Sequence, residues 1–358
     1  MSIAYQTVNS LFATYATPGH PEAMPVSPLP TIPLGLDSDI SVSPLGFGCW
    51  AIGGAFTTPD RAAAGWGEVD DAQSIAAIRR GLELGVTLFD TADVYGTGHS
   101  EEVLGRAVRG ARDEVVLATK FGNTFREGTG EMTGTDLSPA YIRRACEASL
   151  RRLGTDRIDL YQCHVGDLAP AVADEVITTL EQLRAEGHIR AFGISVDDPA
   201  YAQPWAAREG CAAVQFHLNV LEDAPGMLAL CGAHGLAAIA RAPLAMGLLS
   251  GKFDGDSRLP RDDIRGSGAA WLTTFDADGR PSPRFLDALA AIRECLTSDG
   301  RTLIQGALAW IWGRSPMAVP IPGFKTVAQA EENAGALAHG PLAPDTMRQI
   351  DVLLGRAA

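Results

Sequence analysis

The stretch Phe89-Asp90-Thr91-Ala92-Asp93-Val94-Tyr95-Gly96 decides how this chain is to be interpreted. It begins as a short apolar run typical of a buried strand and ends in a turn that carries a carboxylate and a phenol. Two later apolar runs end in the same way, in Ala118-Thr119-Lys120 and in Gln162-Cys163-His164. Because parallel strands place their carboxyl ends at one edge, we expect an acid, a tyrosine, a lysine and a histidine to converge there.

Strand-like and helical patterns alternate along the chain after Pro44. The runs that read as strands are 45–49, 86–90, 114–120, 158–164, 189–196, 212–218, 237–242 and 317–321. The helical patterns between them include 72–84, 101–109, 140–153, 173–186 and 225–234. The pattern at 140–153 follows Ser138-Pro139 and precedes Gly154, which are ordinary start and stop signals of a helix.

Eight strands alternating with helices predict a parallel sheet covered by helices. A single-domain (β/α)8 TIM barrel fits this count. A doubly wound sheet is the alternative, but Gly46-Phe47-Gly48 is only a fragment of the G-x-G-x-x-G turn that a Rossmann unit needs, and no helical pattern follows it. We therefore expect the barrel.

The domain is expected to span 36–358, with 1–35 as a loosely ordered N-terminal extension. Two connections inside the domain are long: 122–138 after the third strand and 246–283 after the seventh. Long loops in a compact domain often serve as lids or binding segments.

Composition excludes several classes of protein. The net charge of −14 argues against broad binding to nucleic acid or to an anionic membrane, and the sequence has no uninterrupted apolar run long enough to span a bilayer. The six cysteines have no CxxC spacing, which predicts reduced thiols of a cytoplasmic protein and no metal site. Nothing in the sequence indicates an oligomeric state.

The converging residues have a joint use in carbonyl chemistry. A buried Asp90–Lys120 pair beside Tyr95 would lower the pKa of the phenol and make it a usable proton donor. His164 could hydrogen-bond a substrate oxygen held beside that phenol. Each residue alone is more often a matter of packing or solvation, but their placement at the ends of three successive strands favours the functional interpretation.

These segments, together with Ser100-Glu101-Glu102, Arg157–His164 and Ile321–Asn333, resemble the aldo-keto reductase superfamily in the family's order, from Leu45 to the C-terminal helix. The resemblance implies a (β/α)8 barrel that binds NADP(H) across its C-terminal face. It implies a catalytic tetrad of Asp90, Tyr95, Lys120 and His164, with Tyr95 as the general acid in reduction.

The resemblance also implies a set of cofactor contacts. Ser195 and Gln215 match ligands of the nicotinamide carboxamide, although Val196 stands where many members have asparagine. Arg241 takes the place of an aromatic ring that stacks on the nicotinamide, and a guanidinium can also stack on a flat ring. The segment that resembles the pyrophosphate-covering loop contains Pro243, Leu244, Gly247, Leu249, Gly251 and Lys252.

Near the C-terminus, Gly323 and Lys325 lead to Gln329, Glu332 and Asn333, of which the last two match adenine-contacting positions. Many NADPH-preferring members have arginine at the position of Gln329, so Lys325 is the cation expected to meet a 2′-phosphate. We expect NADPH to be preferred over NADH. Trp50 matches a family position in the substrate pocket, whereas Trp66 is expected to be ordinary packing.

The resulting expectation is an NADP(H)-dependent oxidoreductase that reduces an aldehyde or ketone, a small molecule, to an alcohol. One alternative is an NAD(P)-linked sugar or alcohol dehydrogenase that works mainly oxidatively. Another is a cofactor-sensing ancillary subunit, because the superfamily includes channel-associated subunits. A third is a barrel lyase or isomerase.

Overall fold

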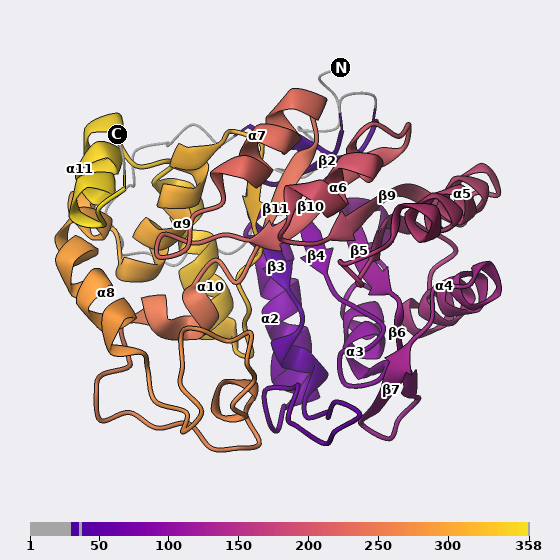
Figure 1. The fold of residues 1–358 in the computed structure, drawn as a ribbon, viewed down its shortest axis with the longest axis horizontal. Coiled ribbons are helices and arrows are strands. Elements are labelled where there is room, and N and C mark those ends of the chain that lie inside the picture. Colours follow the sequence, from indigo (N-terminus) through magenta and orange to yellow (C-terminus); the bar gives the residue numbers. More distant parts are fainter. Residues whose placement is uncertain (1–29, 36–37, 357–358) are drawn as a thin grey trace, which may run out of the picture.

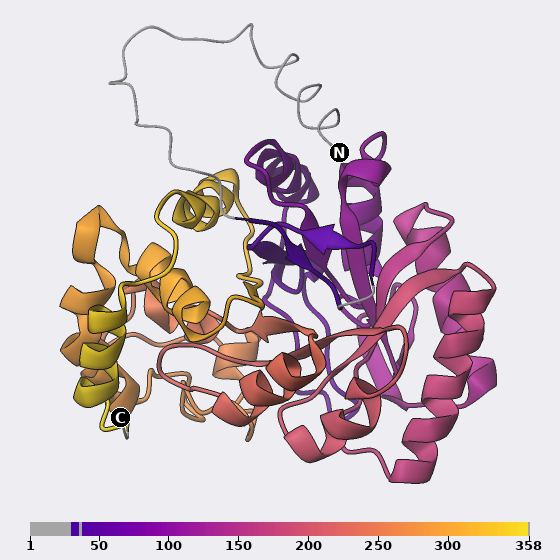
Figure 2. The same cartoon turned by 90° about the horizontal axis from the view of Figure 1, so that it is seen from above.

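The computed structural model of the chain describes residues 30–35 and 38–356. Its centre is a sheet of eight parallel strands, with helices around the outside (Figures 1 and 2). The strands follow one another in chain order: β3 (Gly46–Gly48), β4 (Leu88–Asp90), β5 (Val116–Phe121), β8 (Ile158–Cys163), β9 (Ile189–Ser195), β10 (Cys211–His217), β11 (Ala237–Arg241) and β12 (Ala318–Pro320). The backbone N–H of Gly48 donates to the carbonyl of Pro322 at 3.0 Å, which brings the two ends of the sheet together. The expected single-domain barrel is confirmed, and the doubly wound alternative is excluded.

A ring of helices packs on the outside of the barrel. Its members are α2 (Asp71–Glu83), α3 (His99–Ala107), α4 (Pro139–Leu153), α5 (Pro170–Ala185), α6 (Pro199–Ala206), α7 (Pro225–His234), α9 (Leu303–Arg314) and α10 (Val327–Gly335). Two further helices, α8 (Pro283–Leu296) and α11 (Pro344–Leu353), lie outside α9 (Figure 1). No helix among the described residues has the length and apolar character needed to cross a membrane.

The start and stop signals around α4 act as expected. The Ser138 hydroxyl accepts a hydrogen bond from the Tyr141 N–H at 3.3 Å, and Pro139 occupies the first turn, where its missing N–H costs nothing. Gly154 ends the helix in the left-handed region at φ 66°. The helix thus begins and ends so that the next strand, β8, enters the barrel beside β5.

An antiparallel hairpin lies at the N-terminal end of the barrel. It consists of β1 (Ile32–Pro33) and β2 (Ser41–Val42). Its apolar side chains, among them Leu34 at 0% exposure, belong to the same buried cluster as interior barrel residues such as Leu88 and Ile239. Most of the expected extension, residues 1–29, lies outside the described residues. Within the described part of that extension Ile32 and Leu34 are buried, which removes apolar surface from water.

Both long connections are present at the C-terminal end. The connection after β5, expected as a long loop, contains a hairpin of β6 (Asn123–Arg126) and β7 (Glu131–Thr135). The connection after β11 begins with the 3₁₀ segment η3 (Ala245–Ser250) and is otherwise largely irregular apart from η4 (Ile264–Gly266). The Ile264 N–H donates to the Gly65 carbonyl at 2.9 Å, so this connection is joined to the loop after β3 across the barrel mouth.

The β1–β2 hairpin at the N-terminal end of the barrel generates a stability prediction. Leu34→Ala should lower the free energy of unfolding by about 2–5 kcal/mol, because it leaves a cavity in a closed apolar cluster. Leu353→Ala is the matched control, since that leucine is 44% exposed on α11 and should change stability by about 0.5 kcal/mol or less. Urea unfolding monitored by circular dichroism measures both free energies of unfolding. Similar losses for the two variants would contradict a stabilising role of the hairpin.

Candidate active site

The carboxyl ends of β4, β5 and β8 bring four polar side chains to one point. Lys120 is fully buried; its Nζ forms an ion pair with Asp90, donates to the Thr91 carbonyl at 2.8 Å and lies 3.4 Å from the Tyr95 hydroxyl. The Tyr95 and His164 rings meet edge to face with centroids 5.9 Å apart. Asp90, Tyr95, Lys120 and His164 therefore form one cluster at the barrel mouth.

Asp90 has hydrogen-bond partners in addition to Lys120. The side-chain amides of Gln162 and Gln215 donate to its Oδ2 at 2.9 and 2.8 Å. A buried carboxylate needs such partners, because desolvation without compensation is costly. Sequence reasoning missed Gln162, although it lies two residues before His164 on a strand and so shares its face.

Burial and the local charges fix the protonation of the cluster. Burial acts to lower the pKa of Lys120, but Asp90 and Tyr95 together outweigh it and raise that pKa, which keeps the ammonium charged. Burial, followed by the charges of Lys120 and Arg241, holds the pKa of His164 well below its ordinary value. Its imidazole is therefore neutral, and Nδ1 has no hydrogen-bond partner among the described residues.

The pKa of Tyr95 differs from the sequence-based expectation. Burial raises it above the ordinary value; Lys120 and Arg241 act to lower it, but Asp90 opposes them. The expectation of a lowered pKa was wrong because burial of the phenol outweighs the effect of the Lys120 ammonium, which the Asp90 carboxylate also partly offsets. The phenol is consequently protonated at neutral pH, which is the form that can donate a proton.

The turn that presents Tyr95 depends on a close backbone contact. Gly96 has φ 62°, and a Cβ at this position would lie 1.9 Å from the carbonyl oxygen of Gly53. That same oxygen lies 3.1 Å from Nδ1 of His99, whose Nε2 is 3.0 Å from Asp71. The Tyr95 turn is thus locked against the turn that follows Trp50.

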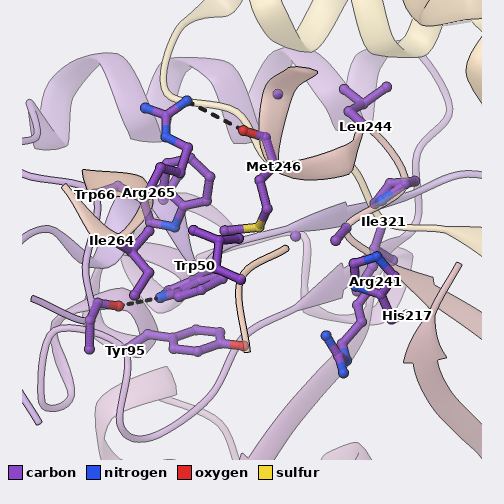
Figure 3. Close-up of a pocket in the computed structure, with 18 of the residues that line it drawn as sticks. Trp50, Trp66, Tyr95, His217, Arg241, Leu244, Met246, Ile264, Arg265 and Ile321 are labelled. Carbon is purple, nitrogen blue, oxygen red and sulfur yellow. Dashed lines mark hydrogen bonds between the residues drawn. The ribbon is translucent and has the colours of Figure 1, made fainter. Parts of the chain in front are cut away.

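A cavity of about 1260 Å³ opens above this cluster. Its aromatic wall is built on Trp50, which stacks on Tyr95 with centroids 5.8 Å apart and donates from Nε1 to the Ala64 carbonyl at 3.0 Å (Figure 3). Trp66 and Trp271 complete the wall, at 5.4 and 6.4 Å from Trp50. Trp66, expected to be ordinary packing, therefore lines the cavity, and Trp271 was not singled out from the sequence.

Most of the residues expected to contact a cofactor line the same cavity. These are Ser195, Gln215, Arg241, Pro243, Leu244, Gly247, Lys252, Gly323, Lys325, Gln329, Glu332 and Asn333. Two expected residues do not. Leu249 is fully buried in the core, and Gly251 ends η3 in the left-handed region, because successive residues of a tight turn cannot all face the same side.

The loop after β11 has an unusual backbone. Ala245, Met246 and Gly247 follow one another with φ of 48°, 55° and 91°. Non-glycine residues in this region are uncommon and usually mark a constrained or functional segment. Successive amides in such turns can point into a common concavity that suits an anion.

Several polar groups at the far end of the cavity already have protein partners. Nζ of Lys325 donates to the carbonyls of Trp66 at 2.5 Å and Glu68 at 3.1 Å. Gln329 completes a capping box at the start of α10 and accepts from the Lys325 N–H at 2.7 Å. Glu332 accepts from the Thr302 hydroxyl, and Asn333 donates to the Gly323 carbonyl at 3.3 Å.

A group of cations surrounds Lys325. Arg265 forms a bidentate pair with Asp263 at 2.8 and 2.6 Å and lies over the Trp66 ring at 4.6 Å. Burial lowers the pKa of Lys325 and of Lys252, and the charge of Arg265 lowers both further, while the Asp263 carboxylate acts in the opposite direction. Sequence reasoning missed Arg265, because it lies in an irregular loop without a motif.

The opposite wall of the cavity carries a second ion pair. The Arg241 guanidinium is bound by the Asp197 carboxylate, whose Oδ1 accepts from the His217 N–H at 2.7 Å. Nε2 of His217 lies 2.8 Å from Glu222. Arg241 and His217 lie across the cavity from Trp50 and Tyr95 (Figure 3).

The chain belongs to the aldo-keto reductase family. Residues 44–354 match the model described as "Aldo/keto reductase family". The relatives and solved structures that it matches are named as reductases and dehydrogenases, so the chain is an oxidoreductase.

Relatives agree on the fold and differ in cofactor. An NADP(+) aldo-keto reductase of Schizosaccharomyces pombe is 30% identical over 86% of this chain and 87% of its own length. The NADH-specific methylglyoxal reductase of Escherichia coli is also 30% identical, over 86% of this chain and 93% of its own length. The structure of a glycerol dehydrogenase from Gluconobacter oxydans superposes with a TM-score of 0.75 at 30% identity and covers 91% of this chain and 95% of that one.

The buried pair generates a prediction about stability. Lys120→Met should lower the free energy of unfolding by about 3–5 kcal/mol, because it leaves the Asp90 carboxylate buried without its cation. The double variant Lys120→Met/Asp90→Asn should recover part of this loss, since it removes the uncompensated charge. Chemical denaturation of the three proteins measures the effect; a double variant no more stable than Lys120→Met would contradict it.

Proposed function

We propose that this enzyme reduces aldehydes or ketones to alcohols with NADP(H), with Tyr95 as the proton donor. The observation that carries the proposal is the position of the Tyr95 hydroxyl, 3.4 Å from a buried ammonium and beside His164, at the floor of a cavity of about 1260 Å³. A protonated phenol next to a fixed cation and a neutral imidazole suits an oxygen atom that gains negative charge.

The residues at the cavity floor fit a nicotinamide. The buried Nδ1 of His164, which lacks a partner in the described part of the chain, and the polar ends of Ser195 and Gln215 belong to residues that surround this floor. When bound, the reduced nicotinamide would supply hydride to the carbonyl carbon. The carboxamide of the ring would contact Ser195 and Gln215.

Each member of the tetrad has a separate task in this mechanism. Tyr95 and His164 hydrogen-bond the carbonyl oxygen and hold it in position. As negative charge develops on that oxygen, Tyr95 donates its proton, and the Lys120 ammonium stabilises the phenolate that remains. Asp90, fixed by two glutamine amides, keeps Lys120 charged and in place.

The remaining contacts are assigned along the cavity. The left-handed turn at 245–247 and the neighbouring residues Pro243, Leu244 and Lys252 would cover the pyrophosphate, with Leu249 and Gly251 supporting that turn from behind. The adenosine would be bordered by Gly323, Gln329, Glu332 and Asn333. Trp50 would form one wall of the substrate pocket.

We assign NADPH as the preferred cofactor. Support comes from the cluster of Lys252, Arg265 and Lys325, whose mutual repulsion an additional phosphate would relieve. For this, Nζ of Lys325 would exchange its two backbone carbonyl partners for phosphate oxygens. We also place the enzyme in the cytoplasm, because all six cysteines are free and buried.

A mainly oxidative enzyme is the competing proposal, favoured by the similarity to a glycerol dehydrogenase. Initial rates in both directions, measured with a panel of aldehydes, ketones and polyols, separate the two. The protonated state of Tyr95 favours reduction, since oxidation needs the phenolate as base.

The proton-donor role predicts the effect of Tyr95→Phe. This change removes only the hydroxyl, so kcat for carbonyl reduction should fall by about 10²-fold or more, while the Kd of NADPH stays nearly the same. Stopped assays and a fluorescence titration measure the two quantities. Turnover that survives in Tyr95→Phe would refute the assignment.

The phosphate-binding role predicts the effect of Lys325→Ala. The KM for NADPH should rise by about tenfold, the value expected for a lost charge-assisted hydrogen bond, and the KM for NADH should hardly change. Lys325→Arg is the control that keeps the charge and should remain close to the original enzyme. Equal effects of Lys325→Ala on both cofactors would show that the residue acts elsewhere.

A further inference from the structure

Arg241 is a second cation at the floor of the cavity, separate from the buried Lys120. It ends strand β11 and pairs in register with His217 of the neighbouring strand β10. Residues two apart on a strand share a face, so Arg241 follows Ile239 and Ala237, which point into the barrel interior. Its side chain is 32% exposed and borders the cavity together with Tyr95, His164, Ser195 and Gln215.

The ion pair with Asp197 orients this cation. Asp197 is the more exposed partner at 56%, and its Oδ1 is fixed by the His217 N–H. Asp197 also lines the cavity, but Arg241, and not Asp197, is among the charges that act to lower the pKa of Tyr95 and of His164. Asp197 thus holds the guanidinium at the edge of the cavity that contains the two groups that would bind the carbonyl oxygen.

Any ring that delivers hydride beside Tyr95 and His164 must lie within the field of Arg241. The oxidised nicotinamide carries a positive charge, whereas the reduced ring is neutral. The adenosine, phosphates and ribose are common to both forms, so their contacts cancel when the two affinities are compared. The difference is therefore governed by charges close to the ring.

We infer that Arg241, positioned by Asp197, makes the site bind the reduced cofactor more tightly than the oxidised one by electrostatic repulsion of the oxidised ring. The inference rests on the proposed function and adds to it a means of discarding the product cofactor. During reduction, a hydride passes from the reduced ring to the carbonyl carbon and a proton passes from Tyr95 to the carbonyl oxygen, and the phenolate that remains is reprotonated from solvent. The ring then becomes cationic beside a fixed guanidinium, which accelerates its release.

The test compares dissociation constants, not rates. NADP⁺ and NADPH are titrated separately into the purified enzyme, with quenching of tryptophan fluorescence and isothermal calorimetry as readouts. In Arg241→Gln the ratio of the NADP⁺ to the NADPH dissociation constant should fall by about 5- to 10-fold, the effect of one charge a few ångströms away in a partly solvated site. Asp197→Asn should move the ratio in the opposite direction by about twofold or more, because it removes the charge that partly offsets Arg241.

Two controls separate this effect from others. Arg241→Lys keeps the charge and should keep most of the ratio. Arg208→Gln removes one positive charge at the opposite end of the barrel, just before β10, where Arg208 pairs with Asp174 on α5, and should leave the ratio unchanged. Raising the salt concentration should reduce the ratio in the original enzyme more than in Arg241→Gln.

The outcomes discriminate between the two proposals. If the original enzyme binds neither cofactor, the proposed function itself fails. If it binds both and the ratio is the same in Arg241→Gln and Asp197→Asn as in the original enzyme, the proposed function stands and this inference is overturned. A fall in the ratio for both variants would also overturn it, since that would indicate a shape effect and not a charge effect.

Discussion

The ion pair between Lys120 and Asp90 is the interaction on which the site depends. An ammonium and a carboxylate removed from water are stable only with close mutual contact and satisfied hydrogen bonds. Here the carboxylate accepts hydrogen bonds from two glutamine amides, and the ammonium donates one to the Thr91 carbonyl, so both charged groups have hydrogen-bond partners in addition to each other. The third polar neighbour of the ammonium is the Tyr95 hydroxyl, at 3.4 Å. The barrel brings this about because each of the strands β4, β5, β8 and β10 contributes one inward-facing residue.

A second level of organisation surrounds that pair. The cavity has an aromatic wall on one side, built by residues from the loops after β3 and β11, and a charged wall on the other, built from the ends of β9, β10 and β11. The flat apolar surface and the ionic surface face each other across the same floor (Figure 3). A planar cofactor ring and a carbonyl compound of modest polarity would both find complementary surfaces in such a space.

The barrel and the central cluster were accessible from the sequence because both depend on short-range rules. Strand ends, alternation and helix stop signals located β4, β5 and β8 to within two residues, and therefore Asp90, Lys120 and His164. Helix α9 is not among the helical patterns located in the sequence, since it is buried on nearly all sides and has no amphipathic period. Sequence patterns also did not indicate Arg265, Trp271 or the contact between Asp197 and Arg241. Arg265, Trp271 and Asp197 lie in loops or short turns, whose positions are set by tertiary contacts that no local pattern encodes. The direction of the Tyr95 pKa shift was misjudged because a sequence names the neighbours of a group without giving the degree of its desolvation.

The β1–β2 hairpin has a consequence for how this protein can change. By sealing the amino-terminal end of the barrel with its own apolar cluster, it gives that end a stabilising function that is physically remote from the mouth. Insertions and replacements in the loops at the other end can alter what enters the cavity without opening the interior to solvent. Stability and substrate selectivity therefore depend on residues at opposite ends of the barrel, so that each property can change without altering the other.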